Sequence, residues 1–373
     1  MNESLFSGKQ SHNGALMDLK ELFTGKKQLV GLDIGSHSLK LAEIVSTSSG
    51  QMLNRFRQIF LPPGTIVDGV VENPTALAAT IKELFRNSGC KGKGIVTSLS
   101  GNSVIVKKVT LAQMEETELR ELIHDEAGKY LPFDNMDDVN YDFQILGDNE
   151  QNPNQMDVII VAAKKADVSS YLDAITAAGL TVMIMDVDSF ALETMYEANY
   201  EFEENDIVVI VNIGAHLTNI NVIKGGISIF TRDFTIAGNE ITERLQEKYQ
   251  VSAEEAEAMK TEGLEGEQEN MDLKNAILDC AEPICSEIER SVDYFRSTFG
   301  GDYIKHVYLS GGSSRIAGLD NHLSQRLNIE TELMNPLLKI GHNKNNIDAG
   351  KLDSIKTIGA VAIGLGLRKI GDK

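Results

Sequence analysis

The stretch that decides the fold is VGLDIGSHSLKLAEI at residues 30–44, because a closely similar stretch, VIVNIGAHLTNINVI, recurs at residues 209–223. Written one above the other, the two stretches share five identical positions. The identical pairs are Val30 and Val209, Ile34 and Ile213, Gly35 and Gly214, His37 and His216, and Ile44 and Ile223. Asp33 falls on Asn212, its closest neutral relative. The chain therefore carries two copies of one structural unit.

Each copy predicts a buried strand, a tight turn at its glycine, and a second strand, because apolar and β-branched residues flank the turn on both sides. A third strand is expected at 51–60 and at 226–235. A helix is expected after each, at 74–87 and at 239–249. Two copies at this separation indicate two related α/β domains, since a solenoid would repeat at a shorter period.

The turn itself suits a phosphate group. A glycine at the apex of a tight turn exposes successive backbone N–H groups and lets an anion approach closely. The hydroxyls of Ser36 and Ser38 add hydrogen-bond donors, and Lys40 adds a positive charge. The carboxylate of Asp33 at the end of the strand is suited to a hydrated Mg2+. Two such hairpins facing each other would hold a polyphosphate from both sides.

A third segment, VYLSGGSSRIAGL at residues 307–319, predicts a short strand, a glycine pair and then a helix at 319–327. The glycines let the backbone lie against a flat ring, and a helix N-terminus favours an anion. The segment is not the dinucleotide pattern GxGxxG, and no GxxxxGK[ST] occurs in the chain. Rossmann and P-loop nucleotide sites therefore lose support.

Together these segments resemble the phosphate-1, phosphate-2 and adenosine motifs of the actin, sugar kinase and heat-shock ATPase superfamily. Within it, the chain from Leu29 to Arg368 looks like the PilM family of type IV pilus assembly proteins, which is close to the cell-division protein FtsA. The stretch EAGKYLPF at 126–133 resembles the signature of the subdomain that both have in place of actin subdomain 1B. Residues 186–192 and 359–368 resemble the two connecting helices. The resemblance implies an actin-like (ribonuclease H-like) duplicated α/β fold with two domains flanking a nucleotide cleft.

The resemblance also implies that the protein binds ATP with Mg2+. By position it implies nucleotide contacts at Asp33, Gly35, Ser36, Ser38, Lys40, Asn212, Gly214, Thr218, Gly238, Glu240, Glu257, Lys260, Gly311, Gly312 and Ser313. Asp33 would also be the metal ligand. Asp186 and Asp188 would lie on the γ-phosphate side and are the candidate catalytic residues. For Glu257 and Lys260 a solvated helix face is the alternative.

One residue departs from the superfamily pattern. Asn212 stands where these proteins usually have a second Asp, and an amide cannot supply the negative charge that helps to hold Mg2+ or to orient a water. We therefore expect nucleotide binding to survive while hydrolysis is slow or absent.

Residues 101–182 interrupt the duplicated pattern and are expected to form the inserted subdomain. Strands are predicted at 103–109, 140–146 and 156–163, and helices at 116–131 and 167–178. The first helix carries an apolar face suited to a core. The polar stretch 147–155 is predicted to be an exposed loop.

The resemblance also implies a partner. PilM-like proteins bind the cytoplasmic N-terminal tail of the membrane protein PilN near this subdomain. Tyr130 and Phe133, which flank a proline at the end of the helix, are the candidate contacts.

Composition excludes several other classes. The formal net charge of −20 argues against nucleic acid or an anionic lipid surface as a direct partner, and it also serves solubility. Three cysteines without a CxxC pair and seven histidines without HExxH argue against a disulfide framework or a zinc site. No apolar stretch reaches the ~20 residues that span a bilayer. The expected location is cytoplasmic, peripheral to the inner membrane through partners.

Five segments are expected along the chain. They are a mobile N-terminal segment at 1–28; a first domain (1A) at 29–100, completed by 183–205 and 355–373; the insertion (1C) at 101–182; a second domain (2A) at 206–237 and 304–354; and a smaller subdomain (2B) at 238–303. Subdomain 2B should contain a long helix, which is expected to kink or break at Pro283. An acidic loop at 263–272 should precede it.

Two alternative functions use the same fold. A filament-forming ATPase like FtsA or MreB would sediment differently with and without ATP. A sugar or acetate kinase would need an acidic general base facing an acceptor hydroxyl, and no acceptor-binding motif surrounds Asp186 or Asp188.

Overall fold

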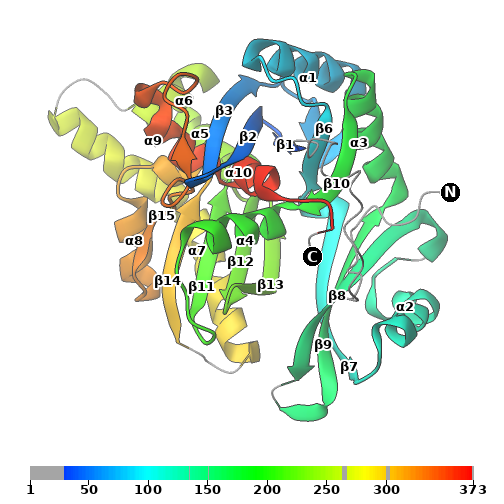
Figure 1. Ribbon diagram of the computed structural model, residues 1–373. Coiled ribbons are helices and arrows are strands. Elements are labelled where there is room, and N and C mark those ends of the chain that lie inside the picture. The colour runs from blue at the N-terminus through cyan, green and yellow to red at the C-terminus, as the bar shows by residue number, and fades with distance from the viewer. Residues whose placement is uncertain (1–28, 134, 150, 263–266, 300–302, 372–373) are drawn as a thin grey trace. The chain divides into compact units, whose positions relative to one another are not determined.

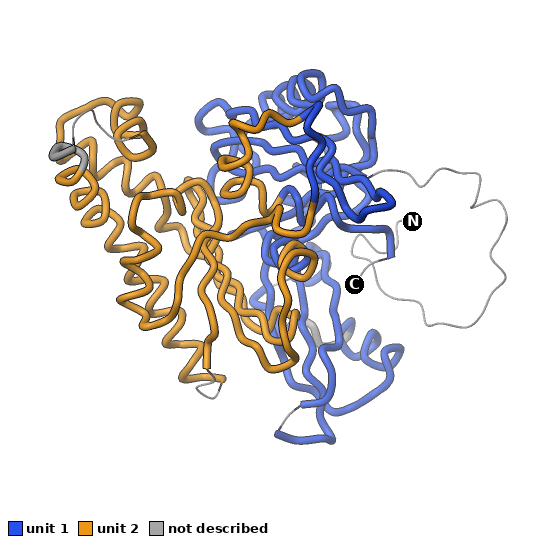
Figure 2. The backbone as a smooth tube through the Cα atoms, turned by 60° about the vertical axis from the view of Figure 1, so that its left-hand side comes forward, with its two compact units in different colours: residues 1–194, 341–346, 362–373 blue, residues 195–340, 347–361 orange. Residues whose placement is uncertain are grey.

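The computed structural model describes residues 29–371 except 134, 150, 263–266 and 300–302. The predicted mobile segment at 1–28 lies outside these residues. The described chain forms two compact units (Figure 2). Unit 1 holds residues up to 194 together with 341–346 and 362 onward, and unit 2 holds 195–340 and 347–361.

Unit 1 is built on a mixed sheet in the order β10-β6-β1-β2-β3-β16 (Figure 1). Its strands are β1 (Leu29–Ile34), β2 (Ser38–Thr47), β3 (Gly50–Phe60), β6 (Gly94–Leu99), β10 (Thr181–Val187) and β16 (Gly341–His342). The predicted hairpin is present, since β1 and β2 are antiparallel, whereas β6 and β10 run parallel to β1. A short ribbon joins β4 (Ile66–Val67) to β5 (Val70–Val71). Three parallel strands therefore place their carboxyl ends at one edge.

Helices α1 (Pro74–Ser88) and α3 (Lys165–Ala177) share one core with the sheet. The ends of α1 are explained by its sequence. The side chain of Asn73 accepts a hydrogen bond from the amide of Ala76, Pro74 opens the first turn, and Gly89 closes the helix at φ 66°. Val30 and Leu32 of β1 are fully buried in this core.

The opposite face of β1 is covered by α10 (Ala360–Leu367), and α10 lies against α4 (Asp188–Asn199). A Cβ added to Gly31 would lie 2.2 Å from the carbonyl oxygen of Ala362. A Cβ added to Gly364 would lie 1.8 Å from the carbonyl oxygen of Ala191. Glycine is therefore required at both contacts, as expected for closely packed connecting helices. The first of these helices begins at Asp188, because Asp186 is still in β10.

The inserted segment forms a three-stranded antiparallel sheet in the order β7-β9-β8, backed by α2 (Glu116–Tyr130). Its strands are β7 (Val104–Ala112), β8 (Val139–Asn149) and β9 (Asn152–Lys164). Leu119 and Ile123 of α2 are fully buried against this sheet. The stretch 147–155 was predicted to be an exposed loop; its described residues are exposed or half-buried, but the loop itself was wrong, because β8 and β9 occupy most of the stretch. The side chain of Asn149 accepts hydrogen bonds from the amides of Gln151 and Asn152, which confines the turn and lets both strands run on into polar sequence.

Unit 2 repeats the plan with a sheet in the order β13-β12-β11-β14-β15. Its strands are β11 (Ile207–Ile213), β12 (Thr218–Lys224), β13 (Ile227–Phe234), β14 (Ile304–Ser310) and β15 (Thr331–Leu333). Its helices are α5 (Gly238–Tyr249), α6 (Ala253–Glu262), α7 (Glu267–Phe299), α8 (Leu319–Leu327) and α9 (Leu352–Ile358). Four of these, α5 to α8, contribute to one apolar core against the sheet.

The long helix α7 is present as predicted and runs through Pro283 without the break that was one of the two expected outcomes. It begins at Glu267, so residues 267–272 of the predicted acidic loop are helical, while residues 263–266 lie outside the described part of the chain. A proline inside a helix costs about 3 kcal/mol. Ile277, Ile284 and Ile288 are all buried in the core, and each contributes roughly 1.5–3 kcal/mol. Burial of this face therefore outweighs the cost of the proline.

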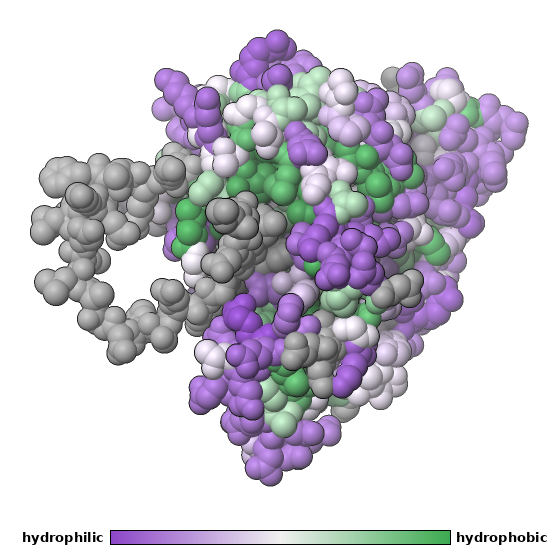
Figure 3. All heavy atoms as spheres, turned by 90° about the vertical axis from the view of Figure 1, so that its right-hand side faces the viewer, coloured by the Kyte–Doolittle hydropathy of each residue, from purple (hydrophilic) through white to green (hydrophobic). Residues whose placement is uncertain are grey.

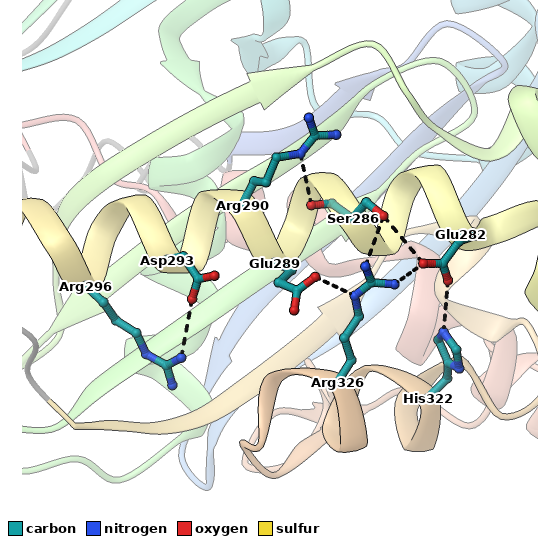
Figure 4. Close-up of polar contacts among 8 residues, drawn as sticks. All are labelled: Glu282, Ser286, Glu289, Arg290, Asp293, Arg296, His322 and Arg326. Carbon is teal, nitrogen blue, oxygen red and sulfur yellow. Dashed lines mark hydrogen bonds and ion pairs between the residues drawn. The ribbon is translucent and has the colours of Figure 1, made fainter.

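A polar network joins α7 to α8 (Figure 4). Arg326 of α8 donates hydrogen bonds to Glu282, to Ser286 at 3.0 Å and to Glu289 at 2.7 Å. His322 lies 3.4 Å from the second carboxylate oxygen of Glu282. The hydrogen bond from Arg326 holds the pKa of Glu282 below its ordinary value. One guanidinium therefore connects two turns of α7 to α8.

None of the helices in the described part of the chain has both the length and the apolar character needed to cross a bilayer. Hydrophilic residues cover much of the face shown in Figure 3, with apolar residues exposed between them.

We expect Arg326→Gln to lower the free energy of unfolding by about 1–2 kcal/mol, because charge-assisted hydrogen bonds to three side chains are lost. This should lower the melting temperature by about 2–6 °C in a thermal unfolding experiment. The matched control is Arg296→Gln. Arg296 lies on α7 with only an exposed partner, Asp293, at 3.7 Å, and its loss should cost less than about 0.5 kcal/mol. Equal shifts for the two variants would contradict this assignment.

The same network predicts a pH dependence. Because the pKa of Glu282 is lowered in the folded state, its contribution is complete above its unfolded pKa and is lost as the pH falls through the lowered value. The difference in melting temperature between wild type and Arg326→Gln should therefore narrow in acid. A difference that widens below pH 4 would argue against this charge pairing.

Candidate functional site in each unit

The turn between β1 and β2 places Asp33 and Lys40 side by side. They are register partners across the two strands, and Lys40 Nζ lies 3.0 Å from Asp33 Oδ2. Both side chains are largely buried, at 10% and 15% exposure. The predicted metal ligand and the predicted phosphate contact thus form one ion pair, which keeps both charges at the end of the hairpin.

The other predicted residues of this turn surround the pair. Gly35 leads the turn, and a Cβ added there would lie 3.6 Å from Lys40 Nζ. Ser36 is partly exposed. Ser38 is buried, and its hydroxyl accepts a hydrogen bond from Gln58 of β3 at 3.0 Å. Ser36 is therefore the hydroxyl of this turn that is more open to a ligand.

Carboxylates gather at the carboxyl ends of the parallel strands, where open α/β sheets bind ligands. Asp186, at the end of β10, receives a hydrogen bond from Arg368 Nε at 2.6 Å. Asp188, which opens α4, accepts from Ser98 Oγ at 2.5 Å. Burial raises the pKa of the Tyr171 hydroxyl, and the charges of Asp188, Asp167 and Asp33 raise it further. Three carboxylates, two of them paired with the cations Lys40 and Arg368, therefore lie at this edge of unit 1.

A divalent cation is suited to these carboxylates, but the residues do not form a preformed metal-binding cluster. Among the residues that the structure describes, no cluster of three or more His, Cys, Asp or Glu side chains is arranged to hold a metal ion. Mg2+ commonly takes only one or two carboxylates and completes its shell with waters and phosphate oxygens. Asp33 fits that role as a single protein ligand.

In unit 2, three predicted glycine segments meet. The amide of Gly238, at the start of α5, donates to the carbonyl of Gly214 at 3.0 Å. Ser313 Oγ donates to the same carbonyl at 3.2 Å. A Cβ added to Gly238 would lie 2.0 Å from Ser313 Oγ. The β11–β12 turn, the start of α5 and the loop after β14 are therefore in direct contact, as the motif order implied.

Gly311 and Gly312 have different roles in that loop. Gly311 has φ +88°, and a Cβ added to it would lie 2.4 Å from the carbonyl oxygen of Ile213 and 2.8 Å from Asn212 Oδ1. A Cβ added to Gly312 would meet nothing within 4 Å. Gly311 is therefore required by the backbone, whereas Gly312 leaves an open surface beside it.

Lys260 and Glu257 of α6 join the same region. Lys260 Nζ donates to the carbonyl of Gly238 at 3.1 Å and to Thr242 Oγ1 at 2.8 Å, and it pairs with Glu257 at 2.7 Å. Its side chain is only 5% exposed, whereas that of Glu257 is 41% exposed. The alternative of a solvated helix face therefore does not hold for Lys260, which anchors α6 to the start of α5.

Two other predicted contacts of unit 2, Thr218 and Glu240, have partners of their own. Thr218 is fully buried, and its hydroxyl donates to the carbonyl of Ile236 at 2.9 Å. Glu240 forms an ion pair with Arg244 one turn further along α5, at 2.8 Å.

The structure adds residues that the sequence did not single out. Thr242 links Lys260 and Glu257 to α5, and Arg368 pairs with Asp186. Asn219 hydrogen-bonds Asn212 at 3.1 Å. Of these residues, only Asn219 could have been found from the sequence, because it aligns with Lys40 when the two hairpin sequences are written one above the other.

The predicted partner contacts, Tyr130 and Phe133, are both half-buried against the core of the inserted sheet. Tyr130 is the last residue of α2, Phe133 follows in the segment after the helix, and both residues are partly exposed.

Comparison with solved structures agrees with this architecture. A structure described as the PilM-PilN type IV pilus biogenesis complex matches with a TM-score of 0.82 and 28% identity, over 94% of this chain and 100% of that one. The ethanolamine utilization protein EutJ from Carboxydothermus hydrogenoformans matches with a TM-score of 0.53 and 15% identity, over 91% and 88% of the two chains. The duplicated fold is that of the actin-like ATPases, as predicted.

The family follows from the sequence. Residues 31–370 match the family described as type IV pilus assembly protein PilM. Because the match spans most of the chain, the protein belongs to the PilM family, and the resemblance stated from its motifs is confirmed.

We expect Gly311→Ala to lower the free energy of unfolding by about 2–4 kcal/mol, because the new Cβ meets backbone at a positive φ. Gly312→Ala is the matched control one residue away, and its effect should stay within about 0.5 kcal/mol. Chemical denaturation of both variants measures the difference. Similar losses at the two positions would contradict the loop geometry.

Proposed function

We propose that this chain is an ATP-binding, actin-like scaffold of the type IV pilus assembly platform, which docks the cytoplasmic tail of PilN at the inner membrane. The observation that carries the proposal is the match to the PilM-PilN complex over nearly the whole of both chains. Membership of the PilM family supports it. The location follows from the proposed partner, since the protein would reach the membrane face through PilN.

We propose nucleotide contacts in each of the two units, each taken by itself. In unit 1, Asp33, Gly35, Ser36, Ser38 and Lys40 would take the phosphates and a Mg2+. In unit 2, the proposed nucleotide contacts are Asn212, Gly214, Thr218, Gly238, Glu240, Glu257, Lys260, Gly311, Gly312 and Ser313. Support comes from the meeting of three glycine segments in unit 2 and from the Asp33–Lys40 pair in unit 1.

Mg2+ fits the unit 1 edge by its chemistry. Asp33 offers one hard oxygen ligand, and Lys40 beside it offers a cation for a phosphate oxygen. When bound, the metal would neutralise phosphate charge. Around it the chain would supply turn amides and the Ser36 hydroxyl.

Slow or absent hydrolysis is part of the proposal. Asn212 carries no charge, and the two candidate catalytic carboxylates already have partners. Asp186 is paired with Arg368, and Asp188 accepts from Ser98. These existing contacts compete with the orientation of an attacking water by either carboxylate.

We propose further that 1A, 1C, 2A and 2B divide the chain as predicted from the sequence. A bound nucleotide would gate partner binding at the inserted subdomain.

Calorimetry with ATP and Mg2+ tests the nucleotide site. We expect micromolar binding by wild type and at least about a tenfold weaker affinity for Gly312→Asp, because a carboxylate beside the open loop repels phosphate and excludes the ring. Gly312→Ala is the control for the loss of glycine itself and should bind as wild type does. Absence of binding by wild type would make the protein a nucleotide-independent scaffold.

Turnover tests the role of Asn212. We expect wild type to stay well below about 1 s⁻¹, the lower end of ordinary enzyme rates. A rate above that value would overturn the proposal of slow hydrolysis.

Docking is tested with a peptide of the PilN N-terminal tail. Phe133→Ala should weaken its binding about tenfold or more, since aromatic anchors dominate such contacts. The control is Tyr303→Ala in unit 2, whose side chain is exposed and lies outside the inserted subdomain.

In cells, deletion of the PilN tail should release the protein from membranes. Unchanged pelleting would exclude this tail as the anchor.

A further inference from the structure

A row of polar side chains crosses three neighbouring strands of the unit 2 sheet. Asn212 of β11, Asn219 of β12 and Asp233 of β13 are register partners. Asn212 Nδ2 donates to Asn219 Oδ1 at 3.1 Å, and Asn219 Nδ2 donates to Asp233 Oδ1 at 2.7 Å. Asn219 is 3% exposed, whereas Asp233 lies at the surface. We call these three residues the amide ladder.

The direction of the ladder follows from Asp233. An ionised carboxylate can only accept hydrogen bonds. Asn219 must therefore turn its NH2 group toward Asp233, which leaves its oxygen facing Asn212. Asn212 must in turn offer its NH2 group to that oxygen. The remaining oxygen of Asn212 then points away from β12 and lies beside Gly311, where an added Cβ would be 2.8 Å from it.

Unit 1 has a charged pair at the same place. Asp33 and Lys40 are register partners across β1 and β2 and form an ion pair. Their counterparts in unit 2 are Asn212 and Asn219, so both charges are replaced together by neutral amides. The change at 212 is thus compensated at 219, and the bond between Asn212 and Asn219 joins β11 to β12 without a charged group.

We infer that Asn219 and Asp233 are positioning residues, which hold the Asn212 amide with its oxygen toward the Gly311 loop. The inference rests on the proposed nucleotide site and assigns the chemistry of its unit 2 side. Asn212 presents a neutral acceptor, which takes a hydrogen-bond donor such as a water of a hydrated cation. It supplies neither a second anionic metal ligand nor a base.

The same geometry explains why aspartate does not fit at 212 alone. A carboxylate there would place one of its oxygens against Asn219 Oδ1. Asn219 cannot turn round to donate to it without losing its bond to Asp233. Aspartate at 212 therefore requires a donor at 219, which lysine supplies at the corresponding position in unit 1.

The test exchanges the amide and the carboxylate between positions 219 and 233. Asn219→Asp sets a carboxylate against Asp233, whereas the double variant Asn219→Asp with Asp233→Asn restores a donor between 233 and 219. In the double variant position 219 also accepts from Asn212, whereas in the single variant repulsion from Asp233 displaces the 219 carboxylate from Asn212. We would measure thermal unfolding and ATP affinity with Mg2+ at pH 8, because a carboxyl pair can share a proton at lower pH.

We expect Asn219→Asp to lower the melting temperature by several degrees and to weaken ATP affinity about tenfold. The double variant should recover both to within about twofold in affinity, because the exchange conserves the ladder. Lowering the pH to 6 should recover part of the loss in the single variant and change the double variant little. This pH profile separates the ladder from a simple packing defect.

Three results would overturn the inference. The first is an Asn219→Asp protein that unfolds and binds ATP as wild type does. The second is a double variant with a restored melting temperature and an unrestored affinity, since the ladder would then be structural only. The third is a double variant that recovers neither quantity. Wild type that binds no ATP would overturn the proposed function, and the melting temperatures of the variants would then decide the ladder alone.

Discussion

The antiparallel pairing across each glycine turn is the constraint on which the two halves of the molecule depend. The register decides which residues face each other, and in unit 1 it brings Asp33 opposite Lys40. Neighbouring residues of a strand point to opposite faces, so Val30 and Leu32 enter the core while Asp33 does not. A slip of one residue would reverse every side chain of the strand. The turn therefore fixes the core and the functional edge together.

Close backbone contacts are the second requirement. Gly31 and Gly364 allow α10 to lie directly against β1 and α4 in unit 1, at distances no side chain would permit. The apolar sequence of α10 is explained by this burial. Its residues from Ala360 to Ile363 and Leu365 are buried, at 5% exposure or less.

Much of the fold could be predicted because its signals are local. Strand periodicity, the glycine turns and the caps of α1 lie within a few residues of the elements they specify, and the bounds of α8 were predicted without error. The failures arose where distant packing prevailed. Core burial carries α7 through Pro283, and cross-strand pairing carries β8 and β9 into polar sequence.

For the site, the sequence identified the segments that take part. It was less informative about the contacts that each side chain makes. Lys260 and Glu257 were assigned by resemblance, yet their connection through Thr242 depends on the angle between α5 and α6, which no spacing reveals. Asp186 was expected near a ligand, and its partner Arg368 is 182 residues away in the chain. The duplicated hairpin marked Asn212, whereas its orientation depends on Asp233 two strands away.

The contact between Gly214, Gly238 and Ser313 has a mechanical consequence. Three segments far apart in sequence touch backbone to backbone, or nearly so, with no long side chain between them to absorb movement. A displacement of one must therefore carry the other two with it. These loops behave as a single stiff part, and adaptation to a different ligand would require coordinated change in all three.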